Sequence, residues 1–172
     1  WQLMSHAEHR AAAPASVGVA IITVSDSRNK DTDKSGALIR EKLEGNGHTI
    51  VHYAIVKDTA RQIKGELAIA VEKKGCQALI LNGGTGISPR DNTFEVVNGM
   101  LDKRLPGFGE LFRYLSYKEI GSAAIMSRAT LGTYRGRIMV SLPGSTGAVR
   151  LAMDELLLPE LGHLVNTVSP HR

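Results

Sequence analysis

Strand-like and helix-like segments alternate along this chain, and this alternation limits its possible folds more than any other feature. Residues 17–24 (VGVAIITV) form a continuous apolar, β-branched run, which is typical of a strand buried on both faces. Residues 48–56, 77–82 and 137–142 predict further strands. Because helical periodicity separates the first three of these runs, the sequence predicts an α/β fold with a mainly parallel sheet flanked by helices.

The helices are predicted from apolar residues spaced three and four positions apart. In the predicted helix at residues 61–74, Ile63 and Leu67 share a face. Gly45 and Gly47 mark the end of the predicted helix at residues 35–44. The short apolar run at residues 123–126 (AAIM) is interpreted as one more strand. The predicted helices cover residues 35–44, 61–74, 92–101 and 109–119, and a last helix begins near residue 146 and is interrupted at Pro159.

Length and composition exclude several classes of protein. The 172 residues suit one domain, and the single cysteine, Cys76, excludes an internal disulfide, a zinc ribbon and a CxxC redox site. No apolar run reaches the roughly 18 residues of a membrane span. A formal charge of +4, with only 5% aromatic residues, argues against nucleic acid as a partner. With one cysteine and no secretory signal pattern, the predicted compartment is the cytoplasm.

Residues 1–16 differ from the rest of the chain. They are rich in alanine, lack periodicity and begin with Trp1 rather than methionine. We interpret them as a flexible N-terminal extension or a cloning remnant, and residues 17–169 as a single domain.

Four polar loops follow the predicted strands. In open α/β sheets, ligands bind at the carboxyl ends of the strands, so these loops are expected to lie on the ligand-binding edge. They are also the loops richest in Gly, Ser, Thr and Asp, and they cover residues 25–31, 57–59, 82–91 and 143–147.

The loop at residues 82–91 (NGGTGISPRD) carries the strongest signal. Its glycines allow backbone N–H groups to approach an anion closely, and the helix that follows adds a favourable dipole. It matches neither the P-loop nor the GxGxxG pattern. The alternative is a tight turn in which Asp91 caps the next helix. Residues 143–147 (PGSTG) are open to the same two interpretations, and Pro143 excludes a GxSxG nucleophile elbow.

Three acids each follow a different predicted strand, namely Asp26, Asp58 and Asp91. Carboxylate oxygens suit Mg²⁺, which bridges protein carboxylates to phosphates. Taken singly, each acid is better explained as a helix cap or a turn residue, and it is the convergent set that favours a functional role. Arg128, after Ser127, is either a fork for phosphate or carboxylate or a solvated surface residue. The histidines show no zinc-binding spacing, and Cys76 is expected to be a small buried residue.

Taken together, an ordered set of motifs resembles the MoaB/MogA family of molybdenum cofactor biosynthesis proteins, and its MoaB branch most closely. GGTG alone would be a weak signal, but the motifs follow the family's order over most of the chain. They are SDS at residues 25–27, Asp58, GGTGISPRD at 83–91, PGFGE at 106–110, SR at 127–128 and LPGS at 142–145.

This resemblance implies a three-layer α/β domain that assembles into trimers or hexamers and binds molybdopterin, with other molybdenum cofactor biosynthesis proteins as further candidate partners. It also implies a reaction in which the terminal phosphate of molybdopterin is adenylylated by Mg-ATP. Asp58 and Asp91 match the family's two essential acids, and we expect them to hold Mg²⁺. The implied molybdopterin- and nucleotide-binding residues are Ser25, Asp26, Ser27, Gly83, Gly84, Thr85, Gly86, Ser127, Arg128, Pro143, Gly144 and Ser145.

Two other functions fit the same motifs. A non-catalytic molybdopterin carrier needs the glycine loops but not both acids, and an assembly module needs only a symmetric interface, for which residues 108–115 are candidates if they are not simply core. Asn92 stands where many relatives have valine. We expect Asn92 to be exposed and to have little effect.

Overall fold

The computed structural model describes residues 13–169, which form a six-stranded sheet in the order β2-β1-β3-β6-β5-β4. The four strands β2, β1, β3 and β6 run parallel, whereas β5 and β4 are antiparallel to their neighbours. The prediction of a mainly parallel sheet is therefore confirmed. The strands are β1 (Gly18–Val24), β2 (Thr49–Val56), β3 (Ala78–Asn82), β4 (Lys103–Arg104), β5 (Thr130–Tyr134) and β6 (Arg137–Leu142).

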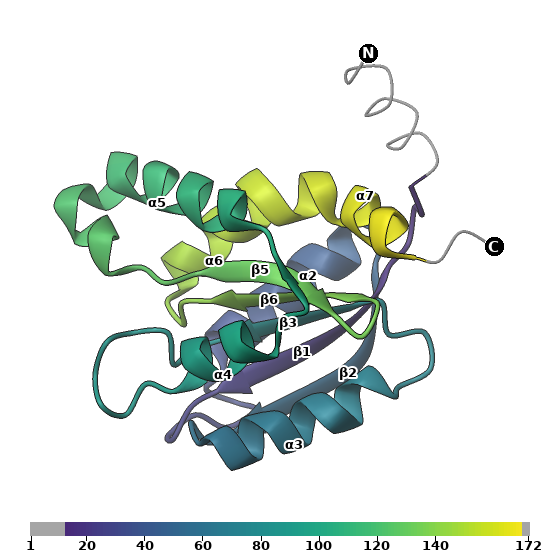
Figure 1. Ribbon diagram of the computed structural model, residues 1–172, viewed down its shortest axis with the longest axis horizontal. Helices are drawn as coiled ribbons and strands as arrows, with labels where there is room; N and C mark the ends of the chain where they lie inside the picture. Colours follow the sequence, from purple (N-terminus) through teal and green to yellow (C-terminus); the bar gives the residue numbers. More distant parts are fainter. Residues whose placement is uncertain (1–12, 170–172) are drawn as a thin grey trace.

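Helices cover both faces of the sheet and produce three layers (Figure 1). α3 and α4 pack on one face, and α2, α5, α6 and α7 pack on the other. The helices are α2 (Lys34–Gly45), α3 (Ala60–Val71), α4 (Thr93–Met100), α5 (Pro106–Ile120), α6 (Thr146–Ala152) and α7 (Leu158–Val168), with a 3₁₀ helix η1 (Gly121–Met126) and a π-helical turn η2 (Met153–Leu157).

Strand β1 supplies side chains to the cores on both faces, which explains its uninterrupted apolar sequence. Val19 and Ile21 pack with α2 and α7, while Ala20 and Ile22 pack with α3 on the opposite face. A strand in the middle of a three-layer domain has no solvent face, so alternation with polar residues would bury unpaired polar groups.

Two sequence predictions were wrong. Residues 123–126 belong to η1 and not to a strand, and Ile125 there is 82% exposed, so apolar composition alone misled the assignment. The missed strand is β5 (TLGTY), whose glycine and threonines give a weak strand signal. It is held in the sheet by antiparallel pairing with β6. Pro159 lies in the first turn of α7, where a missing N–H is tolerated, directly after η2.

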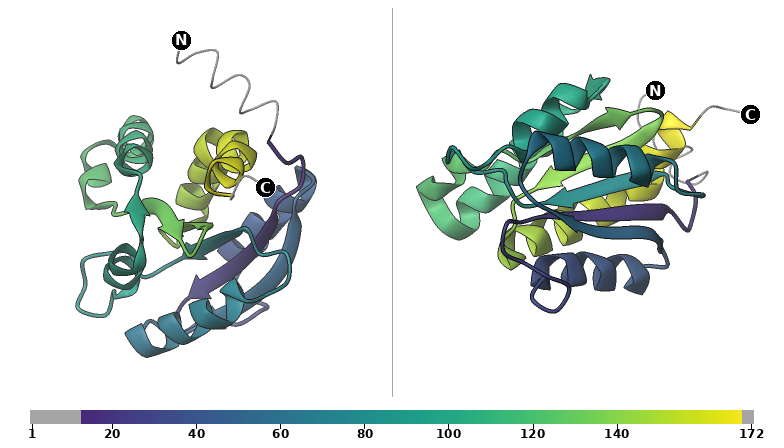
Figure 2. Two further views of the ribbon diagram at one scale, coloured as in Figure 1. Left: turned by 45° about the vertical axis from the view of Figure 1, so that its right-hand side comes forward. Right: turned by 90° about the horizontal axis from the view of Figure 1, so that it is seen from below.

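The chain enters the domain beside its last helix. An ideal Cβ at Gly162 of α7 would lie 2.9 Å from the carbonyl oxygen of Pro14, so the segment before β1 passes close to α7 at this point. Figure 2 shows the same neighbourhood from two further sides. The rest of the predicted extension, residues 1–12, lies outside the described residues, as do His6, His9 and His171. Within residues 13–169, no helix is both long and apolar enough to cross a membrane.

Candidate functional site

A cavity of about 610 Å³ opens at the carboxyl edge of the parallel strands. Residues at the ends of β1, β3 and β6 line it. The neighbours β1 and β3 connect to strands on opposite sides of the sheet, which is the point at which ligands bind in open α/β sheets. Residues from α5, η1 and α6 complete its walls. Of the predicted binding residues, those that line it are Ser25, Ser27, Gly83, Gly84, Thr85, Gly86, Ser127, Pro143, Gly144 and Ser145, together with the predicted acid Asp91.

The glycine loop after β3 passes too close to its neighbours for any side chain. Gly83 has φ +100°, and an ideal Cβ there would lie 2.2 Å from the carbonyl oxygen of Val24. Gly84 has φ +69°, and its Cβ would lie 2.4 Å from Oδ2 of Asp58. Both positions therefore require glycine, for space and for backbone conformation.

This loop presents backbone donors that no other residue in the described range 13–169 uses. The amide groups of Gly84, Thr85 and Gly86 donate no hydrogen bond to another described residue, although all three residues line the cavity. Thr85 is buried, so its amide group is also largely withdrawn from water. Unpaired amide donors along a glycine-rich loop are an anion-binding arrangement, and this geometry favours the anion-binding interpretation over a plain turn.

Arg128 holds the glycine loop from outside the cavity. Its Nε donates to the carbonyl oxygen of Thr85 at 3.0 Å, and its Nη2 donates to that of Gly86. Its guanidinium is also paired with the carboxylate of Glu95 and lies 4.6 Å from the ring centroid of Phe94. Because Arg128 is absent from the cavity lining, the contact that it makes with the site is through the loop backbone.

We expect Arg128→Lys to weaken ligand binding by about tenfold although the charge is kept. A lysine ammonium cannot reproduce the planar fork that holds the Thr85 and Gly86 carbonyls together with the Glu95 carboxylate. Calorimetric titration with Mg-ATP measures this, with Arg113→Lys on α5 as the matched control. Unchanged affinity in the Arg128 variant would show that the loop holds its shape without the fork.

The three predicted acids do converge, but they have different surroundings. The amide of Asp58 donates to Oδ1 of Asp26 at 3.1 Å, and Oδ1 of Asp58 accepts hydrogen bonds from the amide of Asn92 and from Oγ1 of Thr93. Asp58 is only 7% exposed and does not line the cavity. Burial raises its pKa above the usual range, and the negative charges of Asp91 and Asp26 add to this shift.

Asp26 and Asp91 play different parts around this buried carboxylate. Asp26 pairs with Arg90, and this hydrogen bond lowers the pKa of Asp26. Asp26 is exposed and absent from the cavity lining. Asp91 lines the cavity, and its Oδ2 accepts a hydrogen bond from the amide of Ser88 at 3.0 Å. The expectation for Asn92 was wrong, because this residue is half-buried and its Nδ2 donates to the carbonyl oxygen of Asp58 at 3.0 Å.

The acids fit a magnesium ion that arrives with a phosphate ligand. No group of three or more His, Cys, Asp or Glu side chains within residues 13–169 is arranged to hold a metal alone. Mg²⁺ in nucleotide sites needs only one or two carboxylates, because waters and phosphate oxygens fill the other positions. Asp91 on the cavity wall meets this requirement, and Oδ2 of Asp58 receives no hydrogen bond from a described residue.

Sequence reasoning missed several residues that line the cavity. Arg28 lies in a loop that the sequence singled out, but only its serines and Asp26 were named there. Phe112, Ser116 and Glu119 reach the cavity from α5. No local pattern identifies these three, because they contribute only through the packing of α5 against the sheet.

Comparison with known proteins identifies the family. Residues 20–163 match the family described as "Probable molybdopterin binding domain". The chain is 52% identical over 170 residues to molybdenum cofactor biosynthesis protein B of Halalkalibacterium halodurans, covering 98% of this chain and 100% of that one. This chain belongs to the MoaB/MogA family. A further relative, from Bacillus subtilis, has the same name and is 49% identical over 166 residues, covering 96% of this chain and 98% of its own.

Solved structures of the MoaB/MogA family have the same fold. A crystal structure of molybdenum cofactor biosynthesis protein B aligns with a TM-score of 0.87 at 48% identity, over 91% of this chain and 98% of that one. The tungsten cofactor synthesizing protein MoaB from Pyrococcus furiosus aligns with a TM-score of 0.82 at 37% identity, over 91% and 99%. The predicted family membership and three-layer α/β fold are thus confirmed.

Proposed function

We propose that this protein acts in molybdenum cofactor biosynthesis as a cytoplasmic molybdopterin adenylyltransferase. The observation that carries the proposal is the glycine loop, whose amide donors have no partner among residues 13–169. These donors line a cavity beside Asp91, and Asp58 lies against Gly84. Such a loop suits phosphate groups, and the two acids suit the magnesium ion that accompanies ATP. The match to the molybdopterin-binding family supports the pterin as the second substrate.

In the proposed reaction, a terminal phosphate oxygen of molybdopterin attacks the α-phosphorus of ATP. A new P–O bond forms, the bond from the α-phosphorus to the bridging oxygen breaks, and pyrophosphate leaves with that electron pair. The attacking phosphate is already ionised at neutral pH, so no general base is needed. Catalysis then consists of positioning and charge neutralisation, and Mg²⁺ supplies part of the latter.

The residues of the chain divide between holding the metal and binding the ligands. Asp91 would contact the metal from the cavity wall, and Asp58 would contribute Oδ2 and its charge from behind Gly84. We assign Asp26 and Arg128 to the support of these groups, through Asp58 and the glycine loop respectively. The proposed binding residues are Ser25, Ser27, Gly83, Gly84, Thr85, Gly86, Ser127, Pro143, Gly144 and Ser145.

A second candidate function is a non-catalytic molybdopterin carrier. The burial of Asp58 favours it, because a carboxylate outside the cavity lining serves a structural role equally well. Mass spectrometry of a mixture of protein, molybdopterin, ATP and Mg²⁺ separates the two. Adenylylated molybdopterin that disappears when Mg²⁺ is omitted supports the enzyme, whereas bound but unmodified molybdopterin supports the carrier.

We further propose that the protein forms a homo-oligomer, a trimer or a hexamer, through an α5–η1 apolar face. If the protein is instead an assembly module, we propose that it assembles through the same face. Other molybdenum cofactor biosynthesis proteins would be partners in addition to the copies of this chain. Large apolar patches on soluble proteins commonly mark interfaces. The exposed side chains that define the face are Leu111, Tyr114, Tyr117, Ile120, Ile125 and Met126.

A double variant of Tyr117→Asp and Ile125→Asp is expected to convert the oligomer into monomers. Both side chains are more than half exposed, so charges there remain solvated in the monomer but are buried in the interface. Sedimentation velocity measures the change, and Ile69→Asp on α3 is the control, since Ile69 is a similarly exposed apolar residue outside this face. A monomeric parent protein would refute the proposal.

A further inference from the structure

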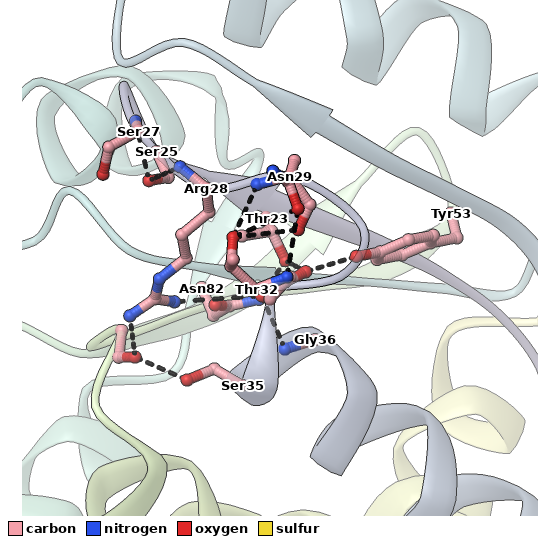
Figure 3. Close-up of polar contacts among 12 residues, drawn as sticks. Thr23, Ser25, Ser27, Arg28, Asn29, Thr32, Ser35, Gly36, Tyr53 and Asn82 are labelled. Carbon is pink, nitrogen blue, oxygen red and sulfur yellow. Dashed lines mark hydrogen bonds and ion pairs between the residues drawn. The ribbon is translucent and has the colours of Figure 1, made fainter.

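The loop after β1 places one arginine at the junction of the three loops that form the cavity floor. Arg28 extends from this loop beside Ser35 (Figure 3), and its Nη2 donates to the carbonyl oxygen of Gly144, in the loop after β6, at 3.1 Å. Ser35 donates to the same carbonyl oxygen at 2.6 Å. Gly83 also lies close to Gly144 and Arg28. An ideal Cβ on Gly144 would lie 3.2 Å from the Cα of Gly83 and 3.8 Å from Nη1 of Arg28.

We infer that Arg28 binds a phosphoryl group at the end of the cavity opposite the magnesium-binding acids. This inference deepens the proposed function and rests on it for the identity of the ligands. Among the described residues that line the cavity, Arg28 is the single Lys, Arg or His, whereas Asp91 and Glu119 are both acidic. Two or more anionic ligands entering this cavity therefore meet one protein cation, and its guanidinium fork matches phosphate oxygens.

The glycine loop sets the direction along the cavity. Gly83 adjoins Gly144 and Arg28, Gly84 lies over Asp58, and an ideal Cβ at Gly86 would be 2.8 Å from Oδ2 of Asp91. The loop thus runs from the cation at its start to the acids at its end. Phosphates that share Mg²⁺ with the acids occupy the latter end, and a phosphoryl group without metal is neutralised by Arg28 at the other.

The guanidinium of Arg28 forms an ion pair with its nearest acid, the buried Asp33, but no hydrogen bond. Asp33 is buried, and its carboxylate accepts hydrogen bonds from the amide of Gly36, from Oγ1 of Thr23 at 2.6 Å and from the hydroxyl of Tyr53 (Figure 3). Nη1 of Arg28 is 3.8 Å from Oδ1 of Asp33, which is too long for a hydrogen bond.

Asp33 therefore keeps its three hydrogen-bond donors if Arg28 turns toward a ligand. The Arg28 side chain is 33% exposed and lines the cavity, so a ligand in the cavity can reach it. The opposing explanation is that Arg28 serves only to neutralise Asp33 and to hold the Gly144 loop. The phosphoryl-binding role and this structural role predict different results for substitutions of Arg28. Only the phosphoryl-binding role makes the effect on ligand affinity depend on whether the ligand carries a phosphoryl group.

The test measures binding without turnover, by calorimetric titration of the full chain. The ligands are molybdopterin, the same pterin after removal of its phosphate, and Mg-ATP. Arg28→Gln and Arg28→Lys are compared with Arg61→Gln, which makes the same charge change at an exposed position on α3, away from the cavity. Thermal unfolding of every variant is recorded beside the titrations.

We expect Arg28→Gln to weaken the binding of a phosphate-bearing ligand by about tenfold or more and to leave the binding of the dephosphorylated pterin unchanged. Arg28→Lys should lose less, because it keeps the charge but not the fork. If the variant loses affinity for molybdopterin alone, Arg28 binds the pterin phosphate. If it loses affinity for Mg-ATP alone, Arg28 binds a nucleotide phosphate. Both results support the inference.

Affinities within twofold of the parent, or equal weakening of the two pterin forms, would overturn the inference in favour of the structural role. If Arg28→Gln does not fold, the same comparison of pterin forms is made with Arg28→Lys and decides in the same way. A parent protein that binds these ligands but makes no adenylylated product would refute the proposed enzyme and leave the role of Arg28 standing.

Discussion

Replacing Asp58 with asparagine is expected to slow adenylyl transfer by about a hundredfold or more while leaving the folded protein at least as stable at pH 7. The rate falls because a charge near the magnesium ion is lost, and single groups of this kind commonly contribute a hundredfold or more. The fold survives because an asparagine Oδ1 can still accept from the amide of Asn92 and the hydroxyl of Thr93.

The stability of this variant follows from the raised pKa of Asp58. Burial and the neighbouring acids disfavour its charged form in the folded state, so ionisation of Asp58 lowers stability as pH rises from the ordinary carboxyl pKa through the raised one. Asparagine carries no such cost. The advantage of the variant over the parent should therefore be present at pH 7 and shrink as pH falls toward the ordinary carboxyl pKa.

Initial rates of product formation and thermal unfolding at several pH values measure these two effects. Asp91→Asn should show a comparable loss of rate, and Asp31→Asn is the control because it makes the same chemical change at an exposed site in the loop after β1. An Asp58 variant that keeps the parent's rate would exclude this carboxylate from catalysis. Equal loss of binding and rate would indicate that Asp58 mainly shapes the glycine loop.

Gly83→Ala is expected to lower the free energy of unfolding by about 3 kcal/mol and the melting temperature by roughly 10 °C. The added methyl group would lie 2.2 Å from a backbone oxygen of Val24 in β1, and a central strand cannot move aside without disturbing its ladder. The φ angle of +100° adds strain for any residue with a side chain. Ligand binding should be lost as the loop is displaced.

Thermal and denaturant unfolding measure this effect, with Gly65→Ala as the matched substitution. Gly65 lies within α3, and no atom is within 4 Å of its ideal Cβ position. That change should stabilise the protein by about 0.5–1 kcal/mol, because glycine within a helix is entropically unfavourable. If both variants had the same stability, the close contact at Gly83 would not be a constraint on the loop.

Patterns local in sequence predicted most of the elements and about half of the residues that line the cavity. The apolar run of β1 identified a central strand because a strand covered on both faces has no polar positions. The glycines after β3 indicated an anion loop because backbone approach requires them. Strand β5 and helix η1 were misread because their assignment depends on pairing with β6 and on exposure, which local composition does not encode.

The amino-acid sequence by itself determined the layered α/β architecture, three of the loops that line the cavity and the family. Only the tertiary structure decided which side chains face the cavity. It places Asp58 behind Gly84, turns Arg128 outward to hold the loop and brings Arg28 to the cavity floor. The physical reason is that direction and burial of a loop side chain depend on contacts with residues distant along the chain, whereas periodicity and glycine content act locally.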